Sequence, residues 1–162
     1  MSTTPEDTPT DTPWLSADQQ VSWRSFLGGV TALMDQLDRD LRTEHGLSMP
    51  EYEILVRLSE APDRSIRMAE LAAAVGHSRS RVTHTVSRLE RDGLVVRGQC
   101  SEDGRGVSAV LTDEGLAALE RAAHTHVRGV HDHFVAQASP ADFATVGSVM
   151  ATVATHLGAR SF

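Results

Sequence analysis

Apolar residues recur at helical spacing along four stretches of the chain, and these stretches predict its longest helices. They are residues 16–45, 50–58, 112–136 and 140–158. The first carries one apolar stripe made of Phe26, Val30, Leu33, Leu37 and Leu41. The third is expected to place on its core side Leu116, Leu119, Ala123, Val127, Val130 and Phe134. Because this three-to-four-residue spacing is typical of amphipathic helices, the pattern predicts a mainly α-helical chain.

Residues 67–92 show a shorter arrangement of two helical segments joined by a turn that contains glycine. The inward face of the first segment consists of Leu71, Ala72 and Val75, and that of the second consists of Val82, Val86 and Leu89. Gly76 stands after the first segment, where a left-handed backbone conformation ends a helix without a Cβ clash. Ser78 can cap the second segment by accepting a hydrogen bond from a backbone amide. The pattern predicts a helix-turn-helix, although the second segment alone would fit an ordinary amphipathic surface helix.

Residues 94–111 follow as two short β-rich runs around a glycine-containing loop, which predicts a hairpin. The tip carries Arg105 between two glycines, and Asp103 lies close enough in sequence to orient its guanidinium. A guanidinium on a thin loop suits the narrow, electronegative minor groove of DNA. The alternative is an exposed turn whose charges have no function. A hairpin directly after a helix-turn-helix forms the wing of a winged helix.

The charge of the chain is distributed unevenly, and its cations gather on the predicted winged helix. The full chain has a formal net charge of −7, which by itself argues against a polyanionic partner. Residues 64–111 nevertheless hold eight of the fifteen arginines and five acidic residues, so this segment is at +3 and the remainder at −10. A basic surface that coincides with the motif is typical of a protein that contacts phosphates. The chain has no lysine, which suits bidentate phosphate contacts but would also follow from a high-GC genome.

These residues resemble those of the MarR (multiple-antibiotic-resistance regulator) family of winged-helix regulators. The resemblance rests on Glu70-Leu71-Ala72, Gly76, Ser78, Val82-Thr83, Leu89-Glu90, Gly93-Leu94, Arg97, Asp103-x-Arg105, Leu111-Thr112 and Gly115. With the flanking helices it covers about residues 16–158. His77 and Thr85 depart from it, because such regulators usually carry aliphatic residues at these two places. The resemblance implies a fold that is mainly α with a small β-hairpin wing, a winged helix-turn-helix flanked by N- and C-terminal dimerisation helices.

The resemblance also implies a sequence-specific transcriptional regulator, acting as a repressor, that binds a pseudo-palindromic double-stranded DNA site as a homodimer. A small aromatic or anionic effector would release it. The expected DNA-binding residues are Ser78, Arg79, Ser80, Arg81, Thr83, His84, Arg88, Arg97, Asp103 and Arg105. Base edges are assigned to Ser80, Arg81 and His84, phosphates to Ser78, Arg88 and Arg97, and the minor groove to Arg105. The alternative is a winged fold that serves as a protein-interaction module without binding DNA.

Two kinds of reactive side chain lie outside this assignment. Cys100 is the only cysteine, so no intramolecular disulfide forms and a reducing compartment is expected. Because it lies where the first wing strand meets the loop, a redox-responsive regulator is one alternative. Four histidines crowd the helix predicted at residues 112–136, namely His124, His126, His131 and His133. No two have the i, i+4 spacing of helical metal ligands, so we expect no metal site; a metal-responsive regulator, a pH-sensitive interface and histidines without a special role remain open.

The remaining features limit the class of protein. Residues 1–13, rich in threonine, proline and acids, predict a disordered tail before one domain at residues 14–158. No stretch has the apolar length of a membrane span or a secretory signal, so we expect a soluble, cytoplasmic protein. The chain lacks a phosphate-binding glycine loop, a nucleophile elbow, an HExxH motif and paired cysteines. We therefore expect neither enzymatic activity nor a cofactor.

Overall fold

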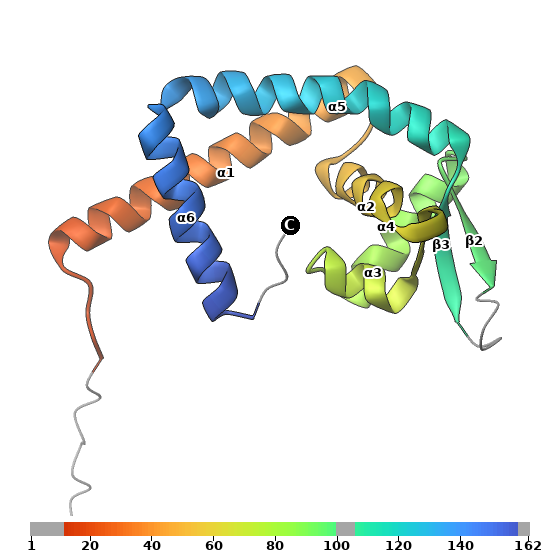
Figure 1. Cartoon of the computed structure of the whole chain (residues 1–162), viewed down its shortest axis with the longest axis horizontal. Coiled ribbons are helices and arrows are strands. Elements are labelled where there is room, and N and C mark those ends of the chain that lie inside the picture. Colours follow the sequence, from red (N-terminus) through yellow and green to blue (C-terminus); the bar gives the residue numbers. More distant parts are fainter. Residues whose placement is uncertain (1–11, 100–105, 159–162) are drawn as a thin grey trace, which may run out of the picture. The chain divides into compact units, whose positions relative to one another are not determined.

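The computed structural model describes residues 12–99 and 106–158, in which helices occupy the stretches where the sequence predicts them (Figure 1). The elements in chain order are α1 (Ala17–His45), α2 (Met49–Glu60), the 3₁₀ turn η1 (Pro62–Arg64), β1 (Ser65–Arg67), α3 (Met68–Ala74), α4 (Arg79–Arg91), β2 (Val95–Gln99), β3 (Val107–Leu111), α5 (Asp113–His133), the 3₁₀ turn η2 (Val135–Gln137) and α6 (Pro140–His156). The chain divides between Ala32 and Leu33 into two compact units. The predicted fold class is confirmed.

Local signals in the sequence set the helix ends. Ser48 caps α2 through a capping box with Glu51, in which each side chain bonds the other residue's backbone amide. Thr112 caps α5 by accepting a hydrogen bond from the Gly115 amide at 2.9 Å. Gly76, at φ +65°, ends the turn after α3, as its position in the sequence predicts. These local signals therefore set where α2 and α5 begin and where the turn after α3 ends.

The wing strands pair as the predicted hairpin, but the sheet contains one more strand than the sequence predicts. β2 pairs antiparallel with β3, with Val95 opposite Leu111. β1, which the hydrophobic pattern did not indicate, pairs antiparallel with the other edge of β3, with Ile66 opposite Ala109. The strand order is therefore β1-β3-β2. Three residues are too few to show the alternation of apolar and polar side chains that marks a strand. β1 is therefore recognised only by its pairing with β3.

The helix-turn-helix closes around a core that the sequence predicted well. The buried side chains contributed by α3, its turn and α4 are Leu71, Ala72, Val75, Val82, Val86 and Leu89. They pack with apolar side chains of α2 and the wing, among them Ile54, Leu55, Leu58 and Val95. All of these lie within residues 33–158. The winged helix thus shares one hydrophobic core with α2, the end of α1 and α5.

The side of α5 that faces this core differs from the predicted stripe. Val127, expected on the core side, is 63% exposed. Leu119 is buried as predicted, and the other buried positions are Gly115, Ala122, Thr125 and Gly129, which the stripe did not include. A Cβ added at Gly115 would lie 2.0 Å from the Leu94 carbonyl oxygen, and one at Gly129 would lie 2.7 Å from the Leu37 side chain. The helix is therefore turned toward its small residues, because these allow close packing.

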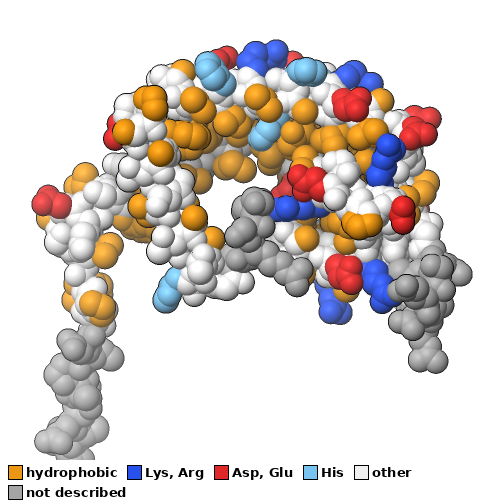
Figure 2. Space-filling view, viewed as in Figure 1, with side chains coloured by type: hydrophobic (Ala, Val, Ile, Leu, Met, Phe, Trp, Pro, Cys, Tyr) orange, Lys and Arg blue, Asp and Glu red, His pale blue; other side chains and the backbone are white. Residues whose placement is uncertain are grey.

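α6 has apolar side chains but buries none of them. Its exposed apolar residues are Phe143, Val146, Val149, Met150 and Val153, and Leu157 follows the helix. Figure 2 shows orange side chains along this helix and on α5. In the other unit, described over residues 12–32, Val21, Trp23, Leu27 and Val30 are likewise exposed. No helix within residues 12–99 and 106–158 combines the length and hydropathy needed to span a bilayer.

Candidate nucleic-acid interface

The N-terminal half of α4 presents a polar, cationic surface to solvent. Arg79, Ser80, Arg81 and His84 are all exposed there. No ion pair joins Arg79 or Arg81 to another residue in the described part of the chain, and both guanidiniums are open to a partner. The opposite side of the helix is held in the core by Val82 and Val86. The sequence-predicted base-contacting residues therefore share one exposed surface.

Ser78 has a structural function at the start of this helix. Its hydroxyl oxygen accepts a hydrogen bond from the Arg81 amide at 3.3 Å, as the sequence predicts for an N-cap. The same hydroxyl lies 3.2 Å from that of Ser80. The cap leaves the amides of the first turn pointing out of the helix end, where the helix dipole favours an anion.

Arg88 lies further along α4 and is engaged inside the protein. Its Nε atom is 3.2 Å from Oε1 of Glu51, which is only 2% exposed. Thr85, one turn earlier and half-buried, donates its hydroxyl to the Arg81 carbonyl at 3.0 Å. This bond gives a partner to the hydroxyl of Thr85, the residue that departs from the aliphatic side chain expected at this position. The predicted phosphate contact of Arg88 therefore competes with an internal ion pair.

Arg97, on the first wing strand, bonds to α4. Its Nη2 atom donates to the Thr83 carbonyl at 3.2 Å and to the Ser87 hydroxyl at 2.7 Å. Its Nη1 atom lies 3.4 Å from the Glu90 carboxylate. The Thr83 side chain itself is exposed on the helix surface. Arg97 thus connects β2 to α4, a function that the sequence pattern did not indicate.

The wing tip falls outside the described residues. Asp103 and Arg105, predicted for the minor groove, and Cys100, the basis of the redox alternative, all lie in the undescribed segment 100–105. Of the residues predicted to contact DNA, the structure therefore describes Ser78, those on α4 and Arg97 on β2.

A second feature is a mainly apolar cavity of about 330 Å³ beside α2. Its lining comes from residues 33–60 and from α5, and consists of Met34, Met49, Tyr52, Glu53, Val56, Arg57, Glu60 and His126. The rings of Tyr52 and His126 pack with centroids 4.7 Å apart. Burial lowers the pKa of the His126 imidazole and raises the pKa of the Tyr52 phenol. The His126 Nδ1 atom is buried without a hydrogen-bond partner within the described residues, so an occupant of the cavity could bond it.

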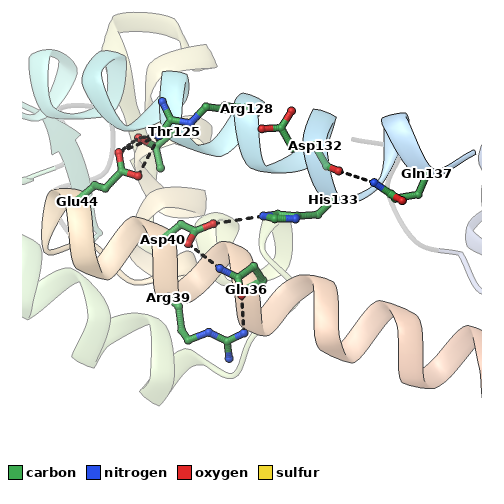
Figure 3. Close-up of polar contacts among 9 residues, drawn as sticks. All are labelled: Gln36, Arg39, Asp40, Glu44, Thr125, Arg128, Asp132, His133 and Gln137. Atoms are coloured by element: carbon green, nitrogen blue, oxygen red, sulfur yellow. Dashed lines mark hydrogen bonds and ion pairs between the residues drawn. The ribbon is translucent and has the colours of Figure 1, made fainter.

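The histidines of α5 separate into different environments. His126 lines the cavity, whereas His133 Nε2 lies 3.9 Å from Asp40 and His131 pairs with the adjacent Asp132. Figure 3 shows His133 pointing toward Asp40, and Glu44 toward Thr125 and Arg128. The Thr125 hydroxyl and then Arg128 lower the pKa of the Glu44 carboxyl. Across the described residues, no three His, Cys, Asp or Glu side chains gather to hold a metal ion.

Glu51 was not among the residues predicted from the sequence, although a signal for it is present. Ser48 and Glu51 have the spacing of a capping box, S-x-x-E, just before an apolar run. That signal predicts the cap but not the burial of the carboxylate or its ion pair with α4. Met34 and Met49 also line the cavity without any distinguishing pattern in the sequence.

The chain matches a family model described as MarR family over residues 45–106. It is 38% identical over 76 residues to the HTH-type transcriptional repressor YetL of Bacillus subtilis, covering 47% of this chain and 46% of that protein. The chain therefore spans about half the length of this curated relative.

Two solved structures match nearly the whole chain. Sco3205, a MarR family transcriptional regulator from Streptomyces coelicolor solved in complex with DNA, is 42% identical, with 89% of this chain and 94% of that chain covered and a TM-score of 0.85. AbsC, from the same family and organism, is 40% identical, with 90% and 98% covered and a TM-score of 0.84.

Proposed function

The chain belongs to the MarR family of transcriptional regulators, and on this premise we propose that it represses transcription by binding double-stranded DNA as a homodimer. The observation that carries the proposal is the exposed surface of α4, on which Arg79, Ser80, Arg81 and His84 lie together. The 42% identity to a regulator solved with DNA supports the same partner.

In the proposed complex, the N-terminal half of α4 enters the major groove. Arg81, His84 and Ser80 then face base edges. The Ser80 hydroxyl can donate a hydrogen bond to a base or accept one from it. The first-turn amides beside Ser78, with Arg79, contact the phosphate backbone. Arg105 reads the minor groove from the wing tip. Arg88 and Arg97 contribute less than the sequence suggested, because both guanidiniums already bond within the protein.

The proposed dimer uses the apolar surfaces that the chain leaves uncovered. An amphipathic helix normally buries its apolar stripe, and exposed apolar surface of this extent marks an interaction site. α6 buries no residue, and Val21, Trp23, Leu27 and Val30 of the other unit are exposed. A second copy of the chain would cover both surfaces. A two-fold dimer would also require an inverted repeat in the DNA.

Release by a small ligand is the regulatory part of the proposal, and the cavity beside α2 is its site. An apolar lining with a few polar groups is typical of ligand pockets. The resemblance implies an aromatic or anionic ligand, and the paired rings of Tyr52 and His126 favour an aromatic one. A ligand would shift the population of dimers away from the DNA-binding spacing of the two recognition helices.

Selection of bound fragments from random DNA by the purified full chain tests the proposal. Enrichment of an inverted repeat, with half-sites about one helical turn apart, is the expected result. A chain that enriches no sequence would overturn the DNA-binding function and favour the protein-interaction alternative.

A further inference from the structure

The contact between α2 and α4 is built around a charged side chain that the protein buries. Glu51 is 2% exposed. Its Oε2 atom accepts hydrogen bonds from the Ser48 amide at 2.8 Å and from the Ser48 hydroxyl at 2.6 Å. Its Oε1 atom faces Nε of Arg88 at 3.2 Å. Each carboxylate oxygen therefore has a partner, one on its own helix cap and one on the recognition helix.

We propose that Arg88 is a positioning residue, which orients the DNA-reading surface of α4 by pairing with Glu51 rather than by holding a phosphate. This inference rests on the proposed DNA-binding function. It names the first turn of α2 as the structural element that sets the position of α4.

The energetics favour the internal partner. Removing one partner of a buried ion pair destabilises the folded protein, because the other charge stays in the interior. Arg42 on α1 also interacts with the Glu51 carboxylate, but Arg88 is the cation in direct contact with it. Arg88 is 41% exposed and can approach Glu51 only while α4 keeps its present orientation against α2. Arg81, by contrast, has an exposed guanidinium with no such partner among the described residues. The two arginines of one helix thus differ in function.

The same turn of α2 borders the cavity. Met49 and Tyr52, on either side of Glu51 in the chain, both line it. The Met49 amide donates to Asp38 at 2.7 Å, which ties this turn to the C-terminal part of α1. An occupant that displaces Met49 or Tyr52 would therefore move Glu51 and, through the ion pair, Arg88. This provides a physical link between the cavity and the reading surface.

A double-mutant cycle measured on DNA binding tests the proposal. The variants are Glu51→Gln, Arg88→Gln and the double variant; glutamine at residue 51 still suits a capping box. Affinity for the selected operator is measured against salt concentration, at a temperature where circular dichroism shows each variant folded. We expect each single change to weaken binding about tenfold and the double change to weaken it no further, since the pair acts as a unit. Arg88→Lys, which keeps a cation for Glu51, should bind the operator with an affinity within about threefold of the wild type.

The salt dependence separates positioning from phosphate contact. Loss of one phosphate contact makes the slope of log affinity against log salt less steep by about 0.9. We expect this change for Arg79→Ala, which the proposed complex places on a phosphate, but not for Arg88→Gln. The inference is overturned if Arg88→Gln makes the slope less steep by that amount while Glu51→Gln binds with wild-type affinity. It is also overturned by a loss of thermal stability with unchanged affinity in the folded variants. If the wild-type chain enriches no operator, the proposed function fails instead, before the cycle is measured.

Discussion

The recognition helix α4 and the C-terminal helix α6 use their apolar residues in opposite ways. α4 buries Val82, Val86 and Leu89 in the core of its own chain and exposes polar and cationic side chains. α6 is the more apolar helix in composition, yet none of its residues is buried. Val149, at its centre, is 55% exposed.

This difference separates two sources of stability. Apolar burial stabilises a helix only where a partner surface removes the side chains from water. For α4 that partner is present within the chain, so its orientation is an internal property of the winged helix. For α6 the partner we propose is a second copy, so its contribution should depend on protein concentration.

The largest expected effect is on the buried side of α4. Leu89→Ala should lower the free energy of unfolding by about 2–5 kcal/mol, because it leaves a cavity in a packed core. Val149→Ala in α6 removes a half-exposed side chain and should change it much less. Chemical denaturation of both variants makes the comparison. Equal losses would show that α6 is packed as tightly as α4.

A smaller effect is expected when a charge enters the apolar surface of α6. Val153→Asp should raise the dimer dissociation constant at least about tenfold, equivalent to about 1.4 kcal/mol, because the interface would bury an unpaired carboxylate. Thr152→Asp adds the same charge one residue away from the apolar stripe and serves as the matched control. Sedimentation over a range of concentrations measures both. If wild type is monomeric at micromolar concentration, α6 has another partner or none.

Removal of the N-cap of α4 should lower the stability of the chain by an amount similar to the expected change in dimer affinity. Ser78→Ala removes the N-cap and should destabilise the chain by about 1 kcal/mol, since the Arg81 amide loses its acceptor. Ser80→Ala, two residues on, removes a hydroxyl that caps no amide and is the control. Denaturation curves with unchanged slopes measure the difference. Equal stability of Ser78→Ala and wild type would mean that water replaces the cap.

The smallest predicted effect is a pH dependence of stability that arises at His126, beside the cavity, and not at α6. The folded chain lowers the pKa of His126 below its ordinary 6.5, so the unfolded chain binds this proton more tightly. Stability should therefore fall as pH drops below about 6.5, and continue to fall until the folded-state pKa is passed. His126→Gln should flatten this part of the profile of unfolding free energy against pH. A profile identical to wild type would assign the dependence to other groups.

Sequence patterns predicted the parts of the fold that are determined locally. Gly76 and Ser78 act on backbone groups within a few residues, so their functions follow from position alone. The side of α5 that packs inward was predicted less well. Gly115 and Gly129 contribute nothing to a hydrophobic stripe, but their lack of a side chain permits the closest approach of neighbouring segments.

The candidate site shows the same limit. Exposure of Arg79, Arg81 and His84 follows from helix periodicity, because the opposite face is apolar. The ion pair of Arg88 joins α4 to α2, and the bonds of Arg97 join β2 to α4. A one-dimensional pattern does not contain such pairings between elements. Long-range contacts therefore decide which cations are available to a partner.

The most direct test of the central claim, that the exposed half of α4 reads DNA in a dimer, is the base preference of Arg81→Ala at each operator position. If Arg81 contacts a base, the variant should bind about 1–3 kcal/mol more weakly and lose preference at two symmetry-related positions, one in each half-site. Weaker binding with every base preference retained would reduce Arg81 to a phosphate contact. Unchanged affinity and unchanged preferences would contradict the account of α4 as the reading helix.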